Sequence, residues 1–305
     1  MRYWLVLLGL MFGKLVAALP ALSVSEVAPG VFVHLSEHHW PDRHNHGEIA
    51  NIGFIVGDRC VAVIDSGGSP QQGIALRGAV KHATTKPICY VINTHVHPDH
   101  IYGNSAFKNE PGVQFVGHHK LARAMATRGD HYLSKADELL DIRVSADNII
   151  PPDLQVKDSM VLNLGHRELV LTAHGTAHTD NDLSIHDKTT DTLWLADLLF
   201  QEHIPVIDGS IKGWLRELEL LEKNRYRLVI PGHGRLVRDW PAGLQPQKAY
   251  LTQLATEIRA MIKQGKTLEQ AVEQVGLSAK NDWQLFDEFH RKNVTIAFAE
   301  LEWED

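Results

Sequence analysis

The sequence contains little cysteine. Only Cys60 and Cys89 occur among its 305 residues, and each lies in a short apolar, β-branched run that is typical of a buried strand. Neither cysteine is near a pattern of metal ligands, so we assign the pair no catalytic role. They are therefore either buried thiols or, in an oxidising compartment, a disulfide between neighbouring strands.

The sequence also lacks an excess of basic residues and, beyond its N-terminus, any long apolar run. A formal net charge of -7 argues against nucleic acid as a partner, because phosphate binding needs a basic surface. Without a later segment of about 20 apolar residues, we expect no stable membrane insertion of the mature protein. No internal repeat, low-complexity tract or linker marks a second domain.

The first 23 residues have the pattern of a secretory signal peptide. Arg2 supplies a positive start, residues 3–12 an apolar segment, and residues 16–18 or 21–23 a small-residue cleavage site. Lys14 interrupts this pattern, so an uncleaved N-terminal anchor is the alternative. We expect a secreted protein, periplasmic if the source is a Gram-negative bacterium, with one mature domain over residues 24–305.

The predicted elements are typical of an α/β fold. A strand at 60–64, a helix at 70–82 and a strand at 87–93 predict a β-α-β unit on a parallel sheet, in which sites form at the carboxyl ends of strands. Residues 160–171 predict a hairpin, and the chain from Trp240 onward is mostly helical. The other predicted strands are 31–35, 49–56, 113–116, 183–186, 192–196 and 227–230, and the other predicted helices are 119–126 and 215–222.

Histidine, in contrast, is abundant, with 19 residues. His95 and His97 lie two apart at the end of a predicted strand, so they can point the same way and share one cation. Pro98 suits the first turn of a helix, which would direct Asp99 and His100 toward a second point. One loop can therefore offer ligands to two metal ions, and imidazole with carboxylate suits zinc where no thiolate is present.

Three further candidate ligands lie downstream. His178 follows the strand-like residues 169–172, Asp197 follows the predicted strand at 192–196, and His233 lies just beyond the predicted strand at 227–230. Because all three are at carboxyl ends of strands, a sheet could bring them to the loop of His95.

The pattern His-x-His-x-Asp-His, followed by a spaced His, Asp and His, resembles the metallo-β-lactamase superfamily over nearly the whole mature chain. The resemblance implies an αββα sandwich and a catalytic domain over residues 24–305 that holds two zinc ions, with iron or manganese also compatible. It further implies that Asp65 orients a ligand histidine; an Asx turn is the alternative. The implied ligands are His95, His97 and His178 for one metal, Asp99, His100 and His233 for the other, and Asp197 as the bridge.

Differences within the superfamily narrow the class. The best-known zinc β-lactamases carry cysteine at the position of Asp197. The aspartate of this chain matches glyoxalase II instead. Flavodiiron proteins carry glutamate at the position of His97, so this histidine argues against di-iron oxygen reduction. A closer resemblance, through residues 49–54, 204–210 and 293–304, is to the quinoprotein relay system zinc metallohydrolases. That branch implies an exported enzyme with a functional link to a periplasmic quinoprotein dehydrogenase.

We therefore expect a metal-dependent hydrolase that acts on a small-molecule ester, thioester, lactone or similar bond. A metal-bridging hydroxide would attack, and Asp99 would be catalytic by accepting a hydrogen bond or a proton from it. The alternatives are a β-lactam hydrolase, a mononuclear-iron persulfide dioxygenase, and a periplasmic metal carrier without enzymatic activity. The histidine-rich loop at 38–46 either lines the substrate mouth, with Trp40, or is simply solvated, and His203 could approach the pocket.

Overall fold

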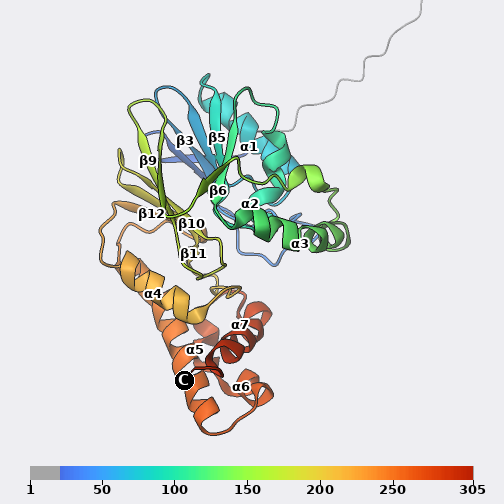
Figure 1. Cartoon of the computed structure of the whole chain (residues 1–305), viewed down its shortest axis with the longest axis vertical. Helices are drawn as coiled ribbons and strands as arrows, with labels where there is room; N and C mark the ends of the chain where they lie inside the picture. Colours follow the sequence, from blue (N-terminus) through green and yellow to red (C-terminus); the bar gives the residue numbers. More distant parts are fainter. Residues whose placement is uncertain (1–20, 305) are drawn as a thin grey trace, which may run out of the picture.

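The computed structural model describes residues 21–304. The predicted signal peptide therefore lies almost entirely outside the described residues. Two β-sheets pack face to face, and helices cover their outer faces (Figure 1). This arrangement confirms the predicted αββα sandwich.

The first sheet has seven strands in the order β1-β2-β3-β4-β5-β6-β7. Strands β1 to β4 pair antiparallel, and β4 to β7 pair parallel. The parallel pair β4 and β5 flanks helix α1 (Pro70–Ala83), which confirms the predicted β-α-β unit. The strands are β1 (Ser25–Ala28), β2 (Val31–His34), β3 (Ile52–Val56), β4 (Val61–Ile64), β5 (Ile88–Ile92), β6 (Gln114–His118) and β7 (Leu154–Val156).

The second sheet has five strands in the order β12-β11-β10-β9-β8. Its pairs are antiparallel except β11 with β12, which are parallel, and β8 with β9 form the predicted hairpin. The strands are β8 (Ser159–Asn163), β9 (Glu168–Ala173), β10 (Leu183–Asp187), β11 (Thr192–Phe200) and β12 (Leu228–His233).

Apolar side chains fill the space between the two sheets. Further apolar side chains pack between the outer face of each sheet and its helices. Ile64 and Ile92 from the first sheet pack with Ile185 and Trp194 from the second, and all four are fully buried. On the outside of the first sheet, α1 contributes Leu76. Central strands such as β4 and β11 are thus buried on two faces, which explains their continuous apolar runs, whereas the edge strand β8 keeps one exposed face.

Most strand ends differ from the prediction by a few residues, β1 and β7 were not predicted, and two of the differences concern the site. Strand β11 continues to Phe200, so Asp197 lies within it, and its register with β12 shifts on either side of Ala196. Ala196 has a positive φ of 45° at this irregularity. Because such a bulge changes the alternation of side chains along a strand, it changes the face to which the following residues point. His233 is the last residue of β12, whereas we expected it just beyond the strand.

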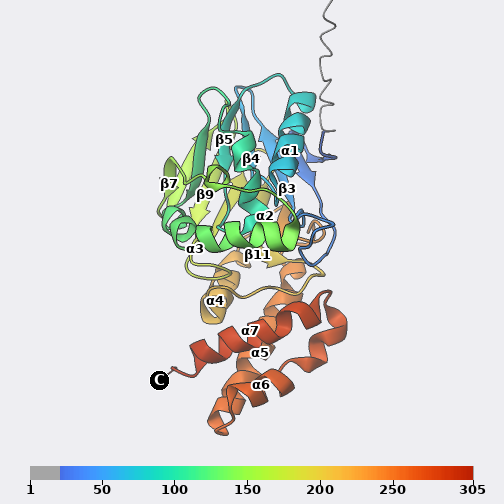
Figure 2. The ribbon, with the colours of Figure 1, turned by 90° about the vertical axis from the view of Figure 1, so that its right-hand side faces the viewer.

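The segment after β5 consists of short helical turns and one longer helix. They are α2 (Pro98–Ile101), η1 (Tyr102–Ala106), α3 (Leu121–Lys135), the π-helical turn η2 (Ala136–Leu140) and η3 (Ala146–Asn148). Pro98 occupies the first turn of α2, as predicted. In Figure 2, α3 crosses the lower end of the sandwich, beside α2.

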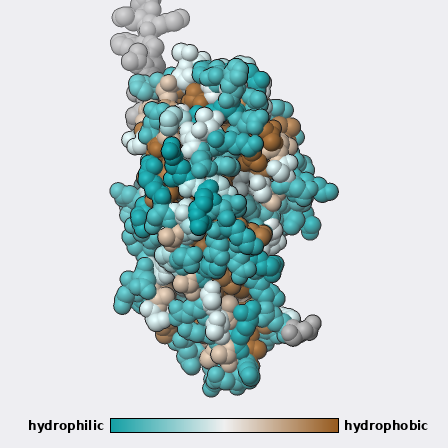
Figure 3. Space-filling view, turned by 90° about the vertical axis from the view of Figure 1, so that its left-hand side faces the viewer, coloured by the Kyte–Doolittle hydropathy of each residue, from teal (hydrophilic) through white to brown (hydrophobic). Residues whose placement is uncertain are grey.

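The C-terminal part is helical, as predicted, and lies at that same lower end (Figures 1 and 2). It comprises α4 (Ile211–Leu221), η4 (Ala242–Leu244), α5 (Gln245–Lys263), α6 (Leu268–Gln274), η5 (Leu277–Asp282) and α7 (Phe286–Leu301). No helix in the described part is long and apolar enough to cross a membrane. On the face in Figure 3, hydrophilic residues predominate and hydrophobic ones form small separate patches.

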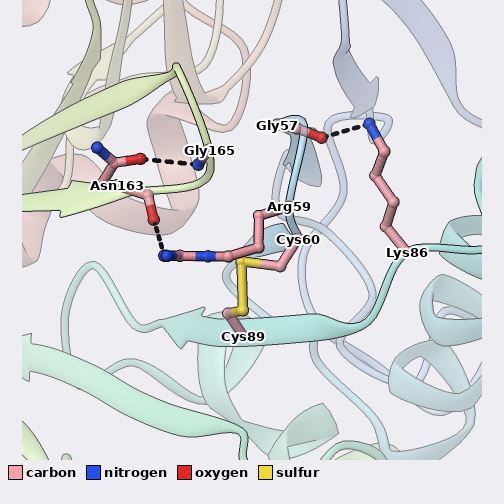
Figure 4. Close-up of a disulfide and its surroundings, with 7 residues drawn as sticks. All are labelled: Gly57, Arg59, Cys60, Lys86, Cys89, Asn163 and Gly165. Carbon is pink, nitrogen blue, oxygen red and sulfur yellow. Dashed lines mark hydrogen bonds between the residues drawn. A yellow bond between two sulfur atoms is a disulfide. The ribbon is translucent and has the colours of Figure 1, made fainter.

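Cys60 and Cys89 form a disulfide, with their Cα atoms 5.8 Å apart. Cys60 immediately precedes β4 and Cys89 lies in β5, its parallel neighbour (Figure 4). Nearby, Lys86 donates a hydrogen bond to the carbonyl oxygen of Gly57, 2.6 Å away. Of the two alternatives left open by the sequence, the structure therefore has the disulfide.

Candidate metal centre

All seven predicted ligands come together at the lower end of the sandwich. They form two groups, and the ligand atoms within each group lie within 4.8 Å of one another. The first group is His95, His97, His178 and Asp197, and the second is Asp99, His100 and His233. Residues from the loop after β5, the β9–β10 turn, β11 and β12 thus converge although they are far apart in the sequence.

In the first group, three imidazoles face a common point. Nδ1 of His97 lies 3.0 Å from Nε2 of His95 and 3.0 Å from Nε2 of His178. His95 and His178 are buried, whereas His97 is half-buried. The open side of this group is therefore at His97.

In the second group, Asp99 lies between two imidazoles. Its Oδ2 atom is 3.4 Å from Nε2 of His100 and 3.4 Å from Nε2 of His233. Both imidazoles are buried, and Asp99 is partly exposed. Asp99 is consequently the ligand of this group that borders the open space outside the site.

Asp197 joins the two groups. Its Oδ2 atom lies 3.3 Å from Nε2 of His178 and 3.4 Å from Nε2 of His233, and its Oδ1 atom lies 3.1 Å from Nε2 of His100. Gly232 gives it room, because a Cβ atom at position 232 would be 1.8 Å from Oδ1 of Asp197. One carboxylate can thus contact both groups.

Two carboxylates orient ligand histidines through the ring nitrogen that faces away from the site. Asp65 Oδ2 accepts a hydrogen bond from His100 Nδ1 at 2.7 Å, and Asp208 Oδ2 accepts one from His97 Nε2 at 3.0 Å. Such partners fix the ring and its tautomer in metal sites. The contact of Asp65 is the one that the family resemblance implies, and Asp65 also accepts a hydrogen bond from the backbone N–H of Thr94 at 2.8 Å.

Backbone carbonyl oxygens orient two more rings. His178 Nδ1 donates to the carbonyl oxygen of Val206 at 2.7 Å, and His233 Nδ1 donates to that of Ile49 at 3.0 Å. His95 Nδ1 lies 3.1 Å from the hydroxyl oxygen of Thr94. Every imidazole of the two groups therefore has its outer nitrogen occupied and its inner nitrogen directed at the site.

These contacts indicate that a cation fits the first group. Since His97 and His178 donate from their outer nitrogens, their inner nitrogens carry lone pairs in the neutral rings. Those inner nitrogens are 3.0 Å apart. Two lone pairs at this distance repel each other unless a positive charge lies between them, and imidazole nitrogens are the usual ligands of zinc.

The site contains two buried atoms that need a partner, one from each group. Nε2 of His100 and Oδ1 of Asp197 are buried and, although they lie 3.1 Å from each other, neither makes a hydrogen bond with the described residues. Buried polar atoms are nearly always satisfied, so an unpaired nitrogen and an unpaired carboxylate oxygen in one site favour a bound cation. The residues present thus fit the metals that the sequence implies.

The ionisation of four of the candidate ligands suits metal binding directly. Burial lowers the pKa of His178 to about 3, and burial together with the nearby His100 keeps the pKa of His95 well below its usual range. Burial alone would raise the pKa of Asp99 and Asp197, but the facing imidazoles, His100 first, hold both well below their usual range. At neutral pH His95 and His178 are therefore neutral imidazoles and the two carboxylates are ionised, the forms that bind metal. Burial alone would lower the pKa of His233 and of His100, but the facing Asp197 and Asp99 raise the pKa of His233 to about 9 and that of His100 well above its usual range. A cation in the second group would therefore displace a proton from each of these two rings.

The role of Asp208 was not predicted from the sequence, where residues 204–210 carry only a family resemblance. Burial alone would raise the pKa of Asp208, but hydrogen bonds from His97 and Arg128 lower it overall. Arg128 belongs to α3, so Asp208 connects this helix with the ligand His97. Nothing in the sequence pairs Asp208 with a residue 111 positions earlier.

Other histidines lie around the site or away from it. The buried ring of His203 packs 5.2 Å from the ring of His233, which confirms its approach to the site. His174 instead contacts Glu217 and Ser184. In the 38–46 loop, Trp40 packs against Phe289 of α7, with ring centroids 5.1 Å apart.

The fold and the site together define an αββα sandwich with a group of residues that could bind metal. The family model of the metallo-beta-lactamase superfamily matches residues 47–233, a stretch that contains all seven ligands. The chain belongs to the metallo-β-lactamase superfamily, whose members are typically metal-dependent hydrolases. No protein among curated sequences matches it.

Solved structures with the same fold are distant in sequence. The metallo-beta-lactamase from Pontibacter korlensis is 18% identical, with 76% of this chain and 99% of that chain covered and a TM-score of 0.59. The metallo-beta-lactamase from Hirschia baltica is also 18% identical, with 76% and 98% covered and a TM-score of 0.58. A double mutant of the sec-alkyl sulfatase PisA1 is 19% identical, with 83% and 45% covered and a TM-score of 0.62. At these identities the likeness extends to the fold alone.

Proposed function

We propose that the protein is an exported hydrolase that binds two zinc ions and cleaves an ester, thioester, lactone or similar bond in a small molecule. The observation that carries this proposal is the pair of ligand groups joined by Asp197. His95, His97 and His178 would hold one ion, Asp99, His100 and His233 the other, and Asp197 would contact both.

When bound, zinc ions lower the pKa of a coordinated water to roughly 7 and polarise a carbonyl oxygen. The protein's own residues set up this chemistry. Asp65 and Asp208 hold ligand rings in place. Asp99, partly exposed and ionised, would accept a hydrogen bond or a proton from the attacking water.

The proposal is tested with purified, metal-analysed protein. We expect two zinc ions per chain and hydrolysis of at least one of 4-nitrophenyl acetate, an acyl thioester and a lactone. The variants His95→Ala and Asp197→Ala should lose metal and activity together, whereas His166→Ala, at an exposed site, should not. Fewer than one transition metal per chain under non-chelating conditions would contradict the proposal.

The same assays address the alternatives. A chromogenic cephalosporin would be the preferred substrate of a β-lactam hydrolase. A mononuclear-iron persulfide dioxygenase would be coloured and consume oxygen, and it would leave the second ligand group without a role. A metal carrier would bind zinc without hydrolysing any member of the panel.

Export and the link to a periplasmic quinoprotein dehydrogenase belong to the proposal as well. The disulfide supports export, because such bonds persist in oxidising compartments. N-terminal sequencing of the protein from the periplasmic fraction of an expressing bacterium should show cleavage within the first 23 residues. Retention of the full N-terminus in the membrane fraction would support an anchor instead.

A further inference from the structure

A cavity of about 360 Å³ opens beside the second ligand group, with Asp99 in its wall. Its other walls come from the loop between β2 and β3, from the end of α3 with η2, and from α7. Since ligand pockets usually measure about 300–1,000 Å³, this cavity suits a compact group rather than a large molecule.

The walls of the cavity are mostly apolar. The apolar side chains are Pro41, Ile49, Pro98, Ala136, Leu139 and Leu140. Leu139 is 49% exposed, so its side chain is accessible to a molecule bound in the cavity. An apolar wall next to a set of metal ligands favours a substrate with an apolar group beside the reacting bond.

Contacts between distant segments hold this wall in place. Nδ1 of His46 donates to the carbonyl oxygen of Leu140 at 2.9 Å, joining the β2–β3 loop to η2. A Cβ atom at Gly47 would meet the Leu140 side chain at 3.0 Å, so the backbone approaches closely there. The leucines belong to a single π-helical turn, a feature found frequently at functional sites.

The cavity also carries one cation with little compensation. Lys292 of α7 is half-exposed, and the one carboxylate within 4.0 Å of its Nζ atom in the described part is Asp208. Asp208 already accepts hydrogen bonds from His97 and Arg128. The other lysine of the lining, Lys135, is paired with Glu138 at 2.6 Å, and Asp99 belongs to the metal ligands.

We infer, on the basis of the proposed hydrolase function, that this cavity receives a compact apolar group of the substrate and that Lys292 binds a carboxylate attached to that group. The substrate would then be a monoanionic ester, thioester or lactone whose carboxylate points toward α7. Lys292 would act in substrate recognition, and the leucines of η2 would select the size of the apolar group.

Binding to the zinc-loaded protein tests this inference independently of hydrolysis. Calorimetric titration would compare 4-phenylbutyrate with its neutral analogue 4-phenylbutanamide. We expect the carboxylate to bind about five-fold more tightly, in keeping with a partly exposed ion pair. Lys292→Met should abolish this preference, and Leu139→Ser should weaken both ligands by about five-fold through lost apolar contact.

Lys280→Met is the matched control, because Lys280 is 54% exposed, similar to the 52% of Lys292, but is paired with Asp287 away from the cavity. It should leave both affinities unchanged. Equal affinity for the two ligands, no binding of either, or a carboxylate preference that survives Lys292→Met would overturn the inference. The expected binding pattern without hydrolysis of any substrate would instead count against the proposed function alone.

Discussion

The imidazole of His97 shows how single residues prepare this site. One ring nitrogen faces two other imidazoles, and the other donates to Asp208, which also accepts from Arg128. His97 is the least buried ring of its group. Its orientation therefore depends on this one carboxylate more than on surrounding side chains.

Asp208→Asn should accordingly weaken zinc binding. The amide keeps the shape but removes the charge and permits the wrong tautomer of His97, so we expect affinity to fall about 10- to 100-fold. Competition with a chromogenic zinc chelator measures the change. Asp130→Asn, at an exposed position of α3, is the control and should bind zinc like the parent protein; equal affinities for all three proteins would contradict the prediction.

The lowered pKa of His118 predicts that the stability of the protein depends on pH. Burial, with His119 and Lys120 nearby, lowers its pKa to about 4, and its Nδ1 accepts the backbone N–H of Lys120 at 3.0 Å. In the unfolded chain the pKa of His118 is near 6.5. Above pH 6.5 the ring is neutral in both states and the folded protein keeps its full stability. As the pH falls from 6.5 toward 4, the unfolded chain binds a proton that the folded protein does not, so the free energy of unfolding decreases. The loss should be about 2 kcal/mol between pH 7 and pH 5.

His118→Asn keeps an acceptor for Lys120 but cannot be protonated. Urea unfolding at pH 7 and pH 5 should therefore show a smaller decrease in the free energy of unfolding for the variant than for the parent. An identical decrease in both proteins would mean that His118 does not cause the acid sensitivity.

The sequence predicts the seven ligands but only part of what orients them. Their residue types and their positions near strand ends are visible in the chain, and so is Asp65 at the end of β4. Val206 and Ile49, in contrast, act through carbonyl oxygens that every residue possesses. Asp208 orients His97 although the two residues are 111 positions apart, and no local sequence pattern links residues at that separation.

At the scale of elements, periodicity predicts the strands well but not their ends. Strand β11 was expected to stop at residue 196, yet it continues to Phe200 beside the shifted register of β12. The helix α3 likewise extends to Lys135 and continues into η2, beyond the predicted end at 126. These extents depend on packing against neighbouring elements, which a local pattern does not contain.

The disulfide between the segments of β4 and β5 should contribute to stability by restricting the unfolded chain. Its cysteines are 29 residues apart, and a closed loop of that size corresponds to about 3–4 kcal/mol in the chain-entropy description. We expect the variant Cys60→Ser with Cys89→Ser to lose that much free energy of unfolding in urea. A reducing agent should destabilise the parent protein but leave the double variant unchanged; an equal effect on both would contradict the prediction.

At the scale of the whole molecule, the metal centre joins parts that are far apart in the sequence. Its candidate ligands come from the segment after β5 of the first sheet and from the β9–β10 turn, β11 and β12 of the second, and α7 adds a wall of the neighbouring cavity. Removing the metals would leave carboxylates and imidazoles buried without partners. The stability of the entire sandwich should therefore depend on metal.

Metal-free protein should unfold at a lower temperature than the zinc-loaded protein. Binding to the folded state at 1,000 times Kd stabilises by about 4 kcal/mol per ion, so two ions should change the Tm by roughly 10 °C or more. Differential scanning calorimetry before and after dialysis against a chelator measures this. Returning zinc, but not magnesium, should restore the higher Tm, and an unchanged Tm in the metal-free protein would count against a buried centre.

The single cross-link described above also bears on how the protein matures. With two thiols in the whole chain, oxidation within one molecule has one product, whereas six cysteines would allow 15 different pairings. An oxidase alone can therefore complete this step, and no isomerase is needed to sort wrong partners from right ones.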